Sequence, residues 1–231
     1  VQKSLGGESR ERLDRLCRRF GLIGRYFSPG PTPSILSPHL HVSYFTRRWY
    51  AADEEHLLPQ TLFVGGSPDV PQDAAPAWLS AIPSEAPLAL VTLGTTFAGE
   101  LGFFSWAAQA AARAGCIPVV VIGYHPYTPD EKAQLKAALP AGTRLLNWAP
   151  FAHLLPRTSL IFHHGGMGTT HAALLHGIPQ IVVPHAADQR GQARRAAQAK
   201  VGLNLSAHDV RQGMLLQAAL ALRSDDQVMQ T

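Results

Sequence analysis

The sequence predicts an α/β protein built on a Rossmann-like, doubly wound parallel sheet. From Leu88 onward, six short apolar segments follow one another, and a segment with helical periodicity separates most of them from the next. Strands that are apolar on both faces are typical of a parallel sheet covered by helices on its two sides. The chain has 231 residues and is 46% hydrophobic, which is enough to bury one such sheet.

The region before Leu88 has a less regular pattern. Residues 9–20 are predicted to form a short amphipathic helix. The Pro-, Ser- and Gly-rich residues 28–38 are not expected to form regular structure. Alternating apolar residues predict short strands at 39–45 and 61–64. Five prolines over residues 66–87 predict a linker.

The elements after this linker alternate between strand and helix. The predicted strands are short apolar runs, at residues 88–93, 117–122, 143–148, 159–162, 180–183 and 202–205. The predicted helices have apolar residues at helical spacing, at residues 103–113, 129–138, 167–176, 189–199 and 209–222. Right-handed crossovers then bring the carboxyl ends of all these strands to one edge of the sheet, where ligands bind in such folds.

The composition excludes several classes of protein. No apolar run approaches the roughly 18 residues that a membrane-spanning helix needs. The net charge of +4 comes without a block of like charges, so we expect no nucleic-acid partner. Over residues 8–19 basic side chains alternate with acidic ones, which is typical of a solvated helix face. Cys17 and Cys116 match no disulfide or metal spacing and favour a reduced, cytoplasmic protein.

Small, polar and aromatic residues follow four of the strands at the carboxyl edge. These turns are Gly94-Thr95-Thr96, Asn147-Trp148-Ala149-Pro150, residues 163–170 and residues 184–189. The third of them, within FHHGGMGTTH, predicts an anion site. Its glycines let a ligand approach the backbone closely, and the helix that follows directs unpaired amides and the positive end of its dipole toward the turn. The candidate ligands of a phosphate or diphosphate here are His164, Gly165, Gly166, Gly168, Thr169 and Thr170.

Other interpretations of this turn were weighed against the anion site. A glycine-rich turn between a strand and a helix can be purely structural, and the turn alone leaves that alternative open. The spacing fails the GxGxxG dinucleotide fingerprint, and the turn after residue 94 lacks the lysine of a P-loop. We expect no metal, because His163 and His164 project in different directions and no carboxylate or cysteine joins them at ligand spacing. His171 is expected to pack or face solvent, and His176 to lie at the helix end with a partly charged ring.

From Trp148 to Gln189 the sequence resembles the donor-binding signature of family 1 (UDP-glycosyltransferase-like) glycosyltransferases, which have the two-domain GT-B fold. The matching pieces are Trp148-Ala149-Pro150, HHGGMGTTHAALLHGIPQIVVP over residues 163–184, and Asp188-Gln189. The form HHGGxGTT is most similar to bacterial antibiotic-tailoring and sterol-type members. The resemblance implies that this part of the chain is the C-terminal donor-binding domain of such an enzyme.

The resemblance also implies roles for individual residues. Trp148 and Ala149 would lie against the nucleotide base. The diphosphate would be bound by His164, Gly165, Gly166, Gly168, Thr169 and Thr170, with Thr95 close to it. Asp188 and Gln189 would hold sugar hydroxyls, and His185, at a strand end facing the site, is a further candidate contact to the sugar.

Two residues depart from the pattern of the plant members. Phe151 replaces a Gln, and Ala172 replaces a Glu that contacts the ribose. The ribose must therefore be held in another way, and we expect UDP, or as second choice dTDP, as the nucleotide. Residues 1–57 are too short for the N-terminal acceptor domain of the family and are expected to be its remnant plus the interdomain connection. Residues 58–231 would form the donor-binding domain.

The sequence thus predicts a glycosyltransferase that moves a sugar from a UDP- or dTDP-sugar to a hydroxyl of a small-molecule acceptor, without a cofactor. The catalytic base is expected in the N-terminal domain. The chain, which begins at Val1, is expected to be a fragment that is inactive alone. Three alternatives are a non-catalytic nucleotide-binding subunit, a sugar-nucleotide epimerase and, on fold alone, a nicotinamide-dependent oxidoreductase.

Overall fold

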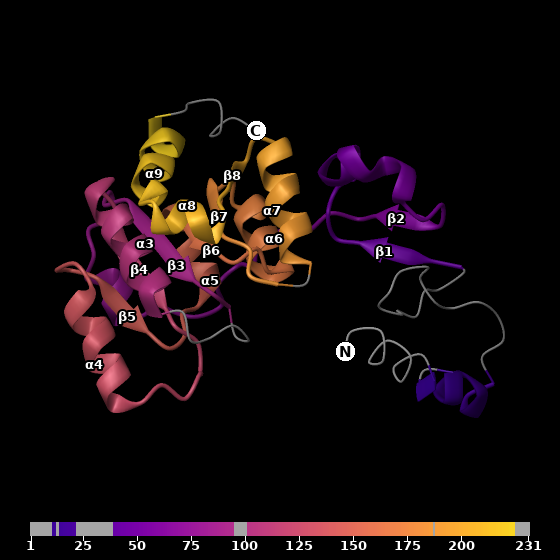
Figure 1. Ribbon diagram of the computed structural model, residues 1–231, viewed down its shortest axis with the longest axis horizontal. Helices are drawn as coiled ribbons and strands as arrows, with labels where there is room; N and C mark the ends of the chain where they lie inside the picture. The colour runs from indigo at the N-terminus through magenta and orange to yellow at the C-terminus, as the bar shows by residue number, and fades with distance from the viewer. Residues whose placement is uncertain (1–10, 13, 22–38, 95–100, 187, 225–231) are drawn as a thin grey trace. The chain divides into compact units, whose positions relative to one another are not determined.

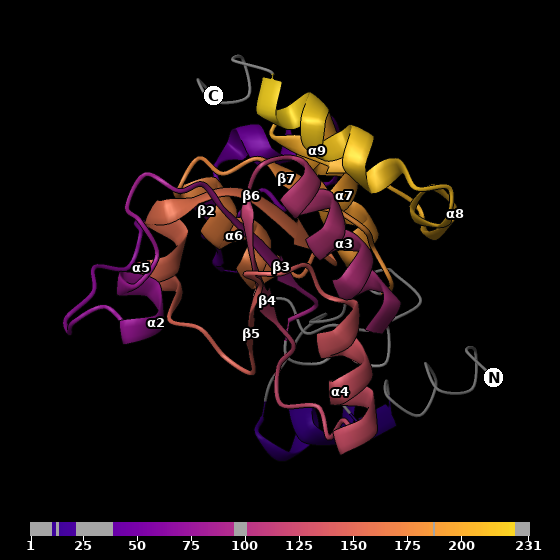
Figure 2. The same ribbon diagram turned by 90° about the vertical axis from the view of Figure 1, so that its left-hand side faces the viewer.

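A computed structural model of the protein describes residues 11–12, 14–21, 39–94, 101–186 and 188–224 (Figures 1 and 2). Thr95, expected near the diphosphate, lies outside these residues. The chain divides into two compact units, one ending at Gly65 and the other beginning at Gly66.

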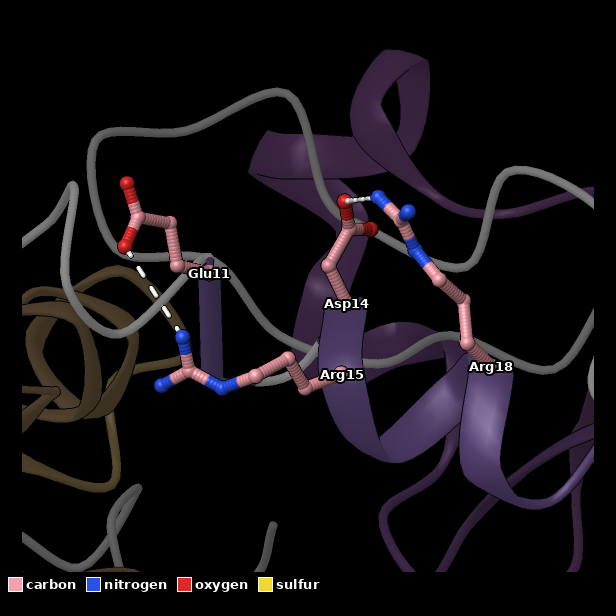
Figure 3. A network of polar contacts seen from close by, with 4 residues as sticks. All are labelled: Glu11, Asp14, Arg15 and Arg18. Atoms are coloured by element: carbon pink, nitrogen blue, oxygen red, sulfur yellow. Dashed lines mark hydrogen bonds and ion pairs between the residues drawn. The ribbon is translucent and has the colours of Figure 1, made fainter.

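In the first unit, the helical residues 14–19 show the charge alternation noted in the sequence (Figure 3). Arg15 lies 4.0 Å from Glu11, and Arg18 lies 3.2 Å from Asp14. Both pairs are four residues apart and largely exposed, so each stabilises the helix by no more than about 0.5 kcal/mol. These charges form a solvated helix face, as the sequence predicts.

The rest of the first unit is a small parallel sheet with an aromatic cluster. Strands β1 (His41–Ser43) and β2 (Thr61–Phe63) pair in parallel and are shorter than predicted. Between them lies η1 (Arg47–His56), a 3₁₀ segment that the sequence pattern did not predict. The buried rings of Phe45 and Trp49 stack with their centroids 5.5 Å apart.

The second unit contains the predicted parallel sheet (Figure 1). Its strands are β3 (Leu88–Thr92), β4 (Ile117–Val121), β5 (Arg144–Leu146), β6 (Thr158–His163), β7 (Gln180–Val182) and β8 (Gly202–Asn204). All neighbours pair in parallel, in the order β5-β4-β3-β6-β7-β8. This is the Rossmann strand order, in which the direction of winding reverses between the first and fourth strands, here β3 and β6. The predicted fold class is confirmed.

Helices cover both faces of this sheet, because alternate strand residues point to opposite sides. Ala89 and Val91 face one apolar cluster and Leu88 and Leu90 face the other, and all four are fully buried. The first cluster takes side chains from α3 (Leu101–Arg113), α4 (Pro129–Ala138), α8 (Ala207–Arg211) and α9 (Met214–Ser224). The second takes them from α2 (Ala77–Ser80), α5 (Phe151–Leu154), η2 (Leu155–Arg157) and α6 (Met167–Leu175). The remaining helix is α7 (Gln189–Gln198). Both ribbon views show α3 and α9 side by side (Figures 1 and 2).

Two predicted elements were wrong in this unit. The helix expected over 209–222 is two helices, α8 and α9, because Gly213 adopts a left-handed φ of 78° between them. The segment 66–87 is more than a linker, because it contains α2 and buries Leu79 and Ile82 in the second cluster. The prolines of this segment are separated from one another, and a short helical turn forms between two of them.

Arg157, the last residue of η2, joins this segment to the chain just before β6. Its guanidinium donates to the carbonyl oxygens of Leu79 at 2.7 Å, Ile82 at 3.0 Å and Pro83 at 2.6 Å. These carbonyls lie at and just beyond the end of α2, where a helix presents its negative pole. The planar fork of arginine can serve several acceptors at once, which the compact lysine ammonium cannot match.

We therefore expect Arg157→Lys to lower the free energy of unfolding by about 1–3 kcal/mol, since it keeps the charge but loses most of these bonds. Urea denaturation measures the change. Arg144→Lys, at an exposed position of β5, is the matched control and should leave stability nearly unchanged. If the Arg157→Lys chain were as stable as the control, the three guanidinium bonds would not contribute to the stability of the fold.

Candidate functional site

A cavity of about 740 Å³ opens where the chain leaves β3, β4, β5 and β6 at the carboxyl edge of the sheet. Its wall includes residues that follow each of these strands: Gly94, Gly123, Tyr124, Asn147, Trp148, Ala149, His164 and Gly166. The cavity therefore spans the point between β3 and β6 where the winding of the sheet reverses. Open parallel sheets bind ligands at this point.

His164 lies between two glycines that belong to different turns. A Cβ atom added to Gly94 would lie 2.8 Å from Cε1 of His164, and one added to Gly166 would lie 2.5 Å from its Nε2. Gly94 also has a left-handed φ of 72°, which favours glycine. The two turns thus leave a slot for the imidazole, and only glycine at both positions keeps it open. His164 is 7% exposed and lines the cavity.

The first turn of α6 supplies the second feature of an anion site. Its first intrahelical bond runs from the Thr170 amide to the Gly166 carbonyl at 3.0 Å, so the preceding amides have no partner within the helix. Gly166 is the N-cap residue and has no side chain with which to cap them. Apart from the helix's own neighbouring backbone, no atom of the described residues lies within 4 Å of a Cβ built on Gly168, so the described structure leaves the end of the helix open. Thr169 lines the cavity here, whereas Gly165 and Thr170 are not among the described residues that line it.

His164 is neutral near pH 7 in this environment. Burial, with a smaller effect of His185 and against an opposing effect of Asp188, lowers its pKa from 6.5 to about 4. His185 and Asp188, two of the predicted sugar contacts, are therefore close enough to His164 to influence its protonation. A bound anion would favour the charged imidazole and raise this pKa.

The turn after β7 is held by Gln189. This side chain is 2% exposed, and its Oε1 accepts hydrogen bonds from the amides of His185 and Ala186, both at 2.9 Å. Asp188 is exposed beside it, and His185 is half-buried with its ring edge-on to Phe103. The three predicted sugar contacts therefore share one turn, but none is among the described residues that line the cavity.

Aromatic side chains also line the cavity. Trp148 is 59% exposed and follows β5, and Tyr124 is 73% exposed and follows β4. Ala149, which is buried, and Phe151 line the cavity as well. Exposed rings at the rim of a cavity can stack on a flat, partly polar ligand such as a nucleotide base.

Sequence reasoning did not predict four of the residues that line the cavity. His171 was expected to pack or face solvent, and His176 to lie at the helix end. Both line the cavity, as do Leu175 and Asp69. Burial lowers the pKa of His176, against an opposing effect of Asp69, and so disfavours the charged form of the ring expected at the helix end. The spacing of Gly168, His171 and Leu175 already places them on one helix face. No local signal placed Asp69 there.

In the part of the chain that the structure describes, no three His, Cys, Asp or Glu side chains gather as they would around a metal ion. Among the same residues, no helix has the length and apolar character needed to cross a bilayer.

Two buried histidines make the stability of the fold depend on pH. The pKa values of His163 and His164 in the folded chain are about 3 and about 4, below the usual 6.5, so the unfolded chain binds these protons more readily. Stability should be complete above about pH 6.5 and fall as the pH drops toward the folded values, by up to about 1.4 kcal/mol per pH unit for each histidine. Urea unfolding at about pH 7 and about pH 5.5 measures this fall.

His164→Ala should remove part of that dependence. His208→Ala, at an exposed position of α8, should keep it. Equal unfolding free energies of the unaltered chain at the two pH values would contradict the buried, neutral state of these rings.

The chain is similar to enzymes of bacterial antibiotic biosynthesis. L-demethylnoviosyl transferase of Streptomyces niveus is 34% identical over 153 residues, 65% of this chain and 39% of that protein. Elloramycin glycosyltransferase ElmGT of Streptomyces olivaceus is 46% identical over 71 residues, 31% of this chain and 19% of that protein. The chain thus spans well under half the length of these relatives.

Solved structures agree with the fold. Spinosyn rhamnosyltransferase SpnG, complexed with thymidine diphosphate, matches with a TM-score of 0.69 and 26% identity over 94% of this chain and 54% of that chain. The calicheamicin glycosyltransferase CalG4 matches with a TM-score of 0.67 and 23% identity, over 96% of this chain and 53% of that chain. The resemblance to GT-B glycosyltransferases is thereby confirmed.

A family model described as "Erythromycin biosynthesis protein CIII-like, C-terminal domain" matches residues 108–230. The match covers more than half of the chain and includes the turn after β6 and all of α6 and α7. The chain therefore belongs to the erythromycin biosynthesis protein CIII-like C-terminal domain family.

Proposed function

We propose that this chain is the donor-binding half of a glycosyltransferase that moves a sugar from a nucleotide-diphosphate donor to a hydroxyl of a small-molecule acceptor. The observation that carries the proposal is the His164 imidazole, seated between Gly94 and Gly166 beside the open first turn of α6. An imidazole, the open first turn of a helix and exposed aromatic rings that line the same cavity suit a nucleoside diphosphate.

The nucleotide proposed is dTDP, with UDP as the second choice, which reverses the order expected from the sequence. The relative SpnG was solved with thymidine diphosphate, and this supports dTDP. Ala172 lines the cavity with a methyl group and offers no acceptor for the extra hydroxyl of a ribose.

In this proposal the cavity binds the donor along its length. The base lies against Trp148 and Ala149. The diphosphate lies at His164, the Thr169 hydroxyl and the amides that open α6. The sugar extends toward Asp188, Gln189 and His185. Since Oε1 of Gln189 already accepts two backbone bonds, its contact to the sugar would come from Nε2.

The reaction breaks the bond between the anomeric carbon of the sugar and an oxygen of the β-phosphate, and forms a bond from that carbon to the acceptor oxygen. The electron pair of the broken bond stays on the leaving diphosphate, whose negative charge grows in the transition state. Hydrogen bonds that strengthen with this charge lower the barrier. Here they come from His164, Thr169 and the helix amides, without a metal or other cofactor. The proton of the acceptor hydroxyl goes to a base in an N-terminal domain, which also forms the acceptor site.

We also propose that the protein works in the cytoplasm. Cys17 and Cys116 are free and buried, as is usual in a reducing compartment.

Calorimetric titration of the chain with dTDP, UDP, GDP and NADH, each with and without EDTA, tests the proposal. We expect dTDP to bind most tightly, UDP more weakly, and both equally well in the presence of the chelator. Binding of NADH alone, a requirement for metal, or no binding of any nucleotide would each contradict a donor site in this half.

His164→Ala should weaken dTDP binding by about 1–3 kcal/mol, the contribution of a charge-assisted hydrogen bond. The same titration measures it. His208→Ala replaces an exposed histidine away from the cavity and should bind dTDP like the unaltered chain. An unchanged affinity in His164→Ala would remove His164 from the site.

A further inference from the structure

Behind the turn that carries His164 lies a buried polar pair that the proposed chemistry does not use. His163, at the end of β6, and Gln180, at the start of β7, are both 0% exposed. Nε2 of His163 and Oε1 of Gln180 are 3.0 Å apart. Polar groups cost free energy to bury, so a pair at the centre of a sheet calls for a physical reason.

The hydrogen bonds fix which nitrogen of His163 carries the proton. The amide of Gly165 donates to Nδ1 at 3.2 Å, so Nδ1 must be the bare acceptor. Nε2 then carries the hydrogen and donates it to Oε1 of Gln180. Burial, with a smaller effect of His164, lowers the pKa of His163 to about 3, so the ring keeps this neutral form near pH 7.

The amide that His163 holds belongs to a tightly packed glycine. Gly165 has a left-handed φ of 87°, and a Cβ atom on it would lie 2.8 Å from Cγ1 of Val182 and 3.0 Å from the carbonyl oxygen of Gln189. Gly165 is thus packed between β7 and the start of α7. The next residue, Gly166, is both the N-cap of α6 and one side of the slot for the His164 ring.

We propose that His163 is a positioning residue for the donor diphosphate. Its Nδ1, kept as an acceptor by Gln180, holds the Gly165 amide so that the first turn of α6 and the His164 ring face the phosphates. This role rests on the proposed function, because it concerns the same diphosphate. It predicts that changes at this buried pair reduce diphosphate binding and leave the base pocket at Trp148 intact.

The test compares dTDP with thymidine, which carries the base and deoxyribose but no phosphate. His163→Leu removes the acceptor for the Gly165 amide and should weaken dTDP about tenfold, equivalent to about 1.4 kcal/mol, with thymidine affinity unchanged. His163→Asn keeps an amide oxygen near the position of Nδ1 and should restore most of the dTDP affinity. Gln180→Leu leaves the proton on Nε2 without its acceptor, so the ring is no longer anchored toward the Gly165 amide, and this variant should also weaken dTDP binding.

Nitrogen-15 spectra of the imidazoles give a readout that packing alone would not change. The unaltered chain should show His163 with its proton on Nε2 and a bare Nδ1, and a proton on Nδ1 would overturn the inference. If His163→Leu does not fold, the contrast between His163→Asn and Gln180→Leu carries the test.

The outcomes separate this inference from the function on which it rests. An unaltered chain that does not bind dTDP would contradict the proposed function, and the inference with it. Where the unaltered chain binds dTDP, affinities for dTDP that agree within about twofold in all the variants would overturn the inference alone. Equal losses of dTDP and thymidine affinity would also overturn it, because they would mark His163 as a general packing residue.

Discussion

The structure depends on one steric constraint, the placement of a single imidazole where two turns meet. Gly94 follows β3 and Gly166 follows β6, and a side chain at either position would collide with the His164 ring. These strands are neighbours only because the sheet is wound in the Rossmann order. The topology brings the two turns together, and the glycines of these turns leave room for the His164 ring beside the cavity.

The cavity provides positive potential without a permanent positive charge. No Lys or Arg is found among the described residues that line it, and His164 is neutral near pH 7 because burial lowers its pKa to about 4. The amides at the start of α6 supply fixed partial charges, and the imidazole can gain a proton as an anion approaches. Such a site would respond most strongly to the extra charge that develops on a leaving diphosphate.

Local patterns predicted most of the fold and brought His164 into the candidate site, whereas contacts between distant segments were not predictable. The strands from Leu88 onward and the turn with His164 follow from short-range periodicity and glycine spacing. The break at Gly213 depends on a left-handed φ, and nothing in the local pattern distinguishes that glycine from one inside a helix. The roles of Arg157 and Asp69 depend on residues far away in the chain. His171 and His176 were judged by type and by helix position, although the helical spacing of His171 already pointed toward the cavity.

The most direct test of the central claim is a titration of the ¹⁵N-labelled chain with dTDP, followed by amide chemical shifts. We expect the largest shifts at Gly166, Gly168 and Thr169, at the start of α6, together with Gly94 across the slot. Thymidine should shift residues near Trp148 and leave the start of α6 almost unchanged. Shifts from dTDP that spare Gly94 and the first turn of α6 would contradict a diphosphate site built around His164.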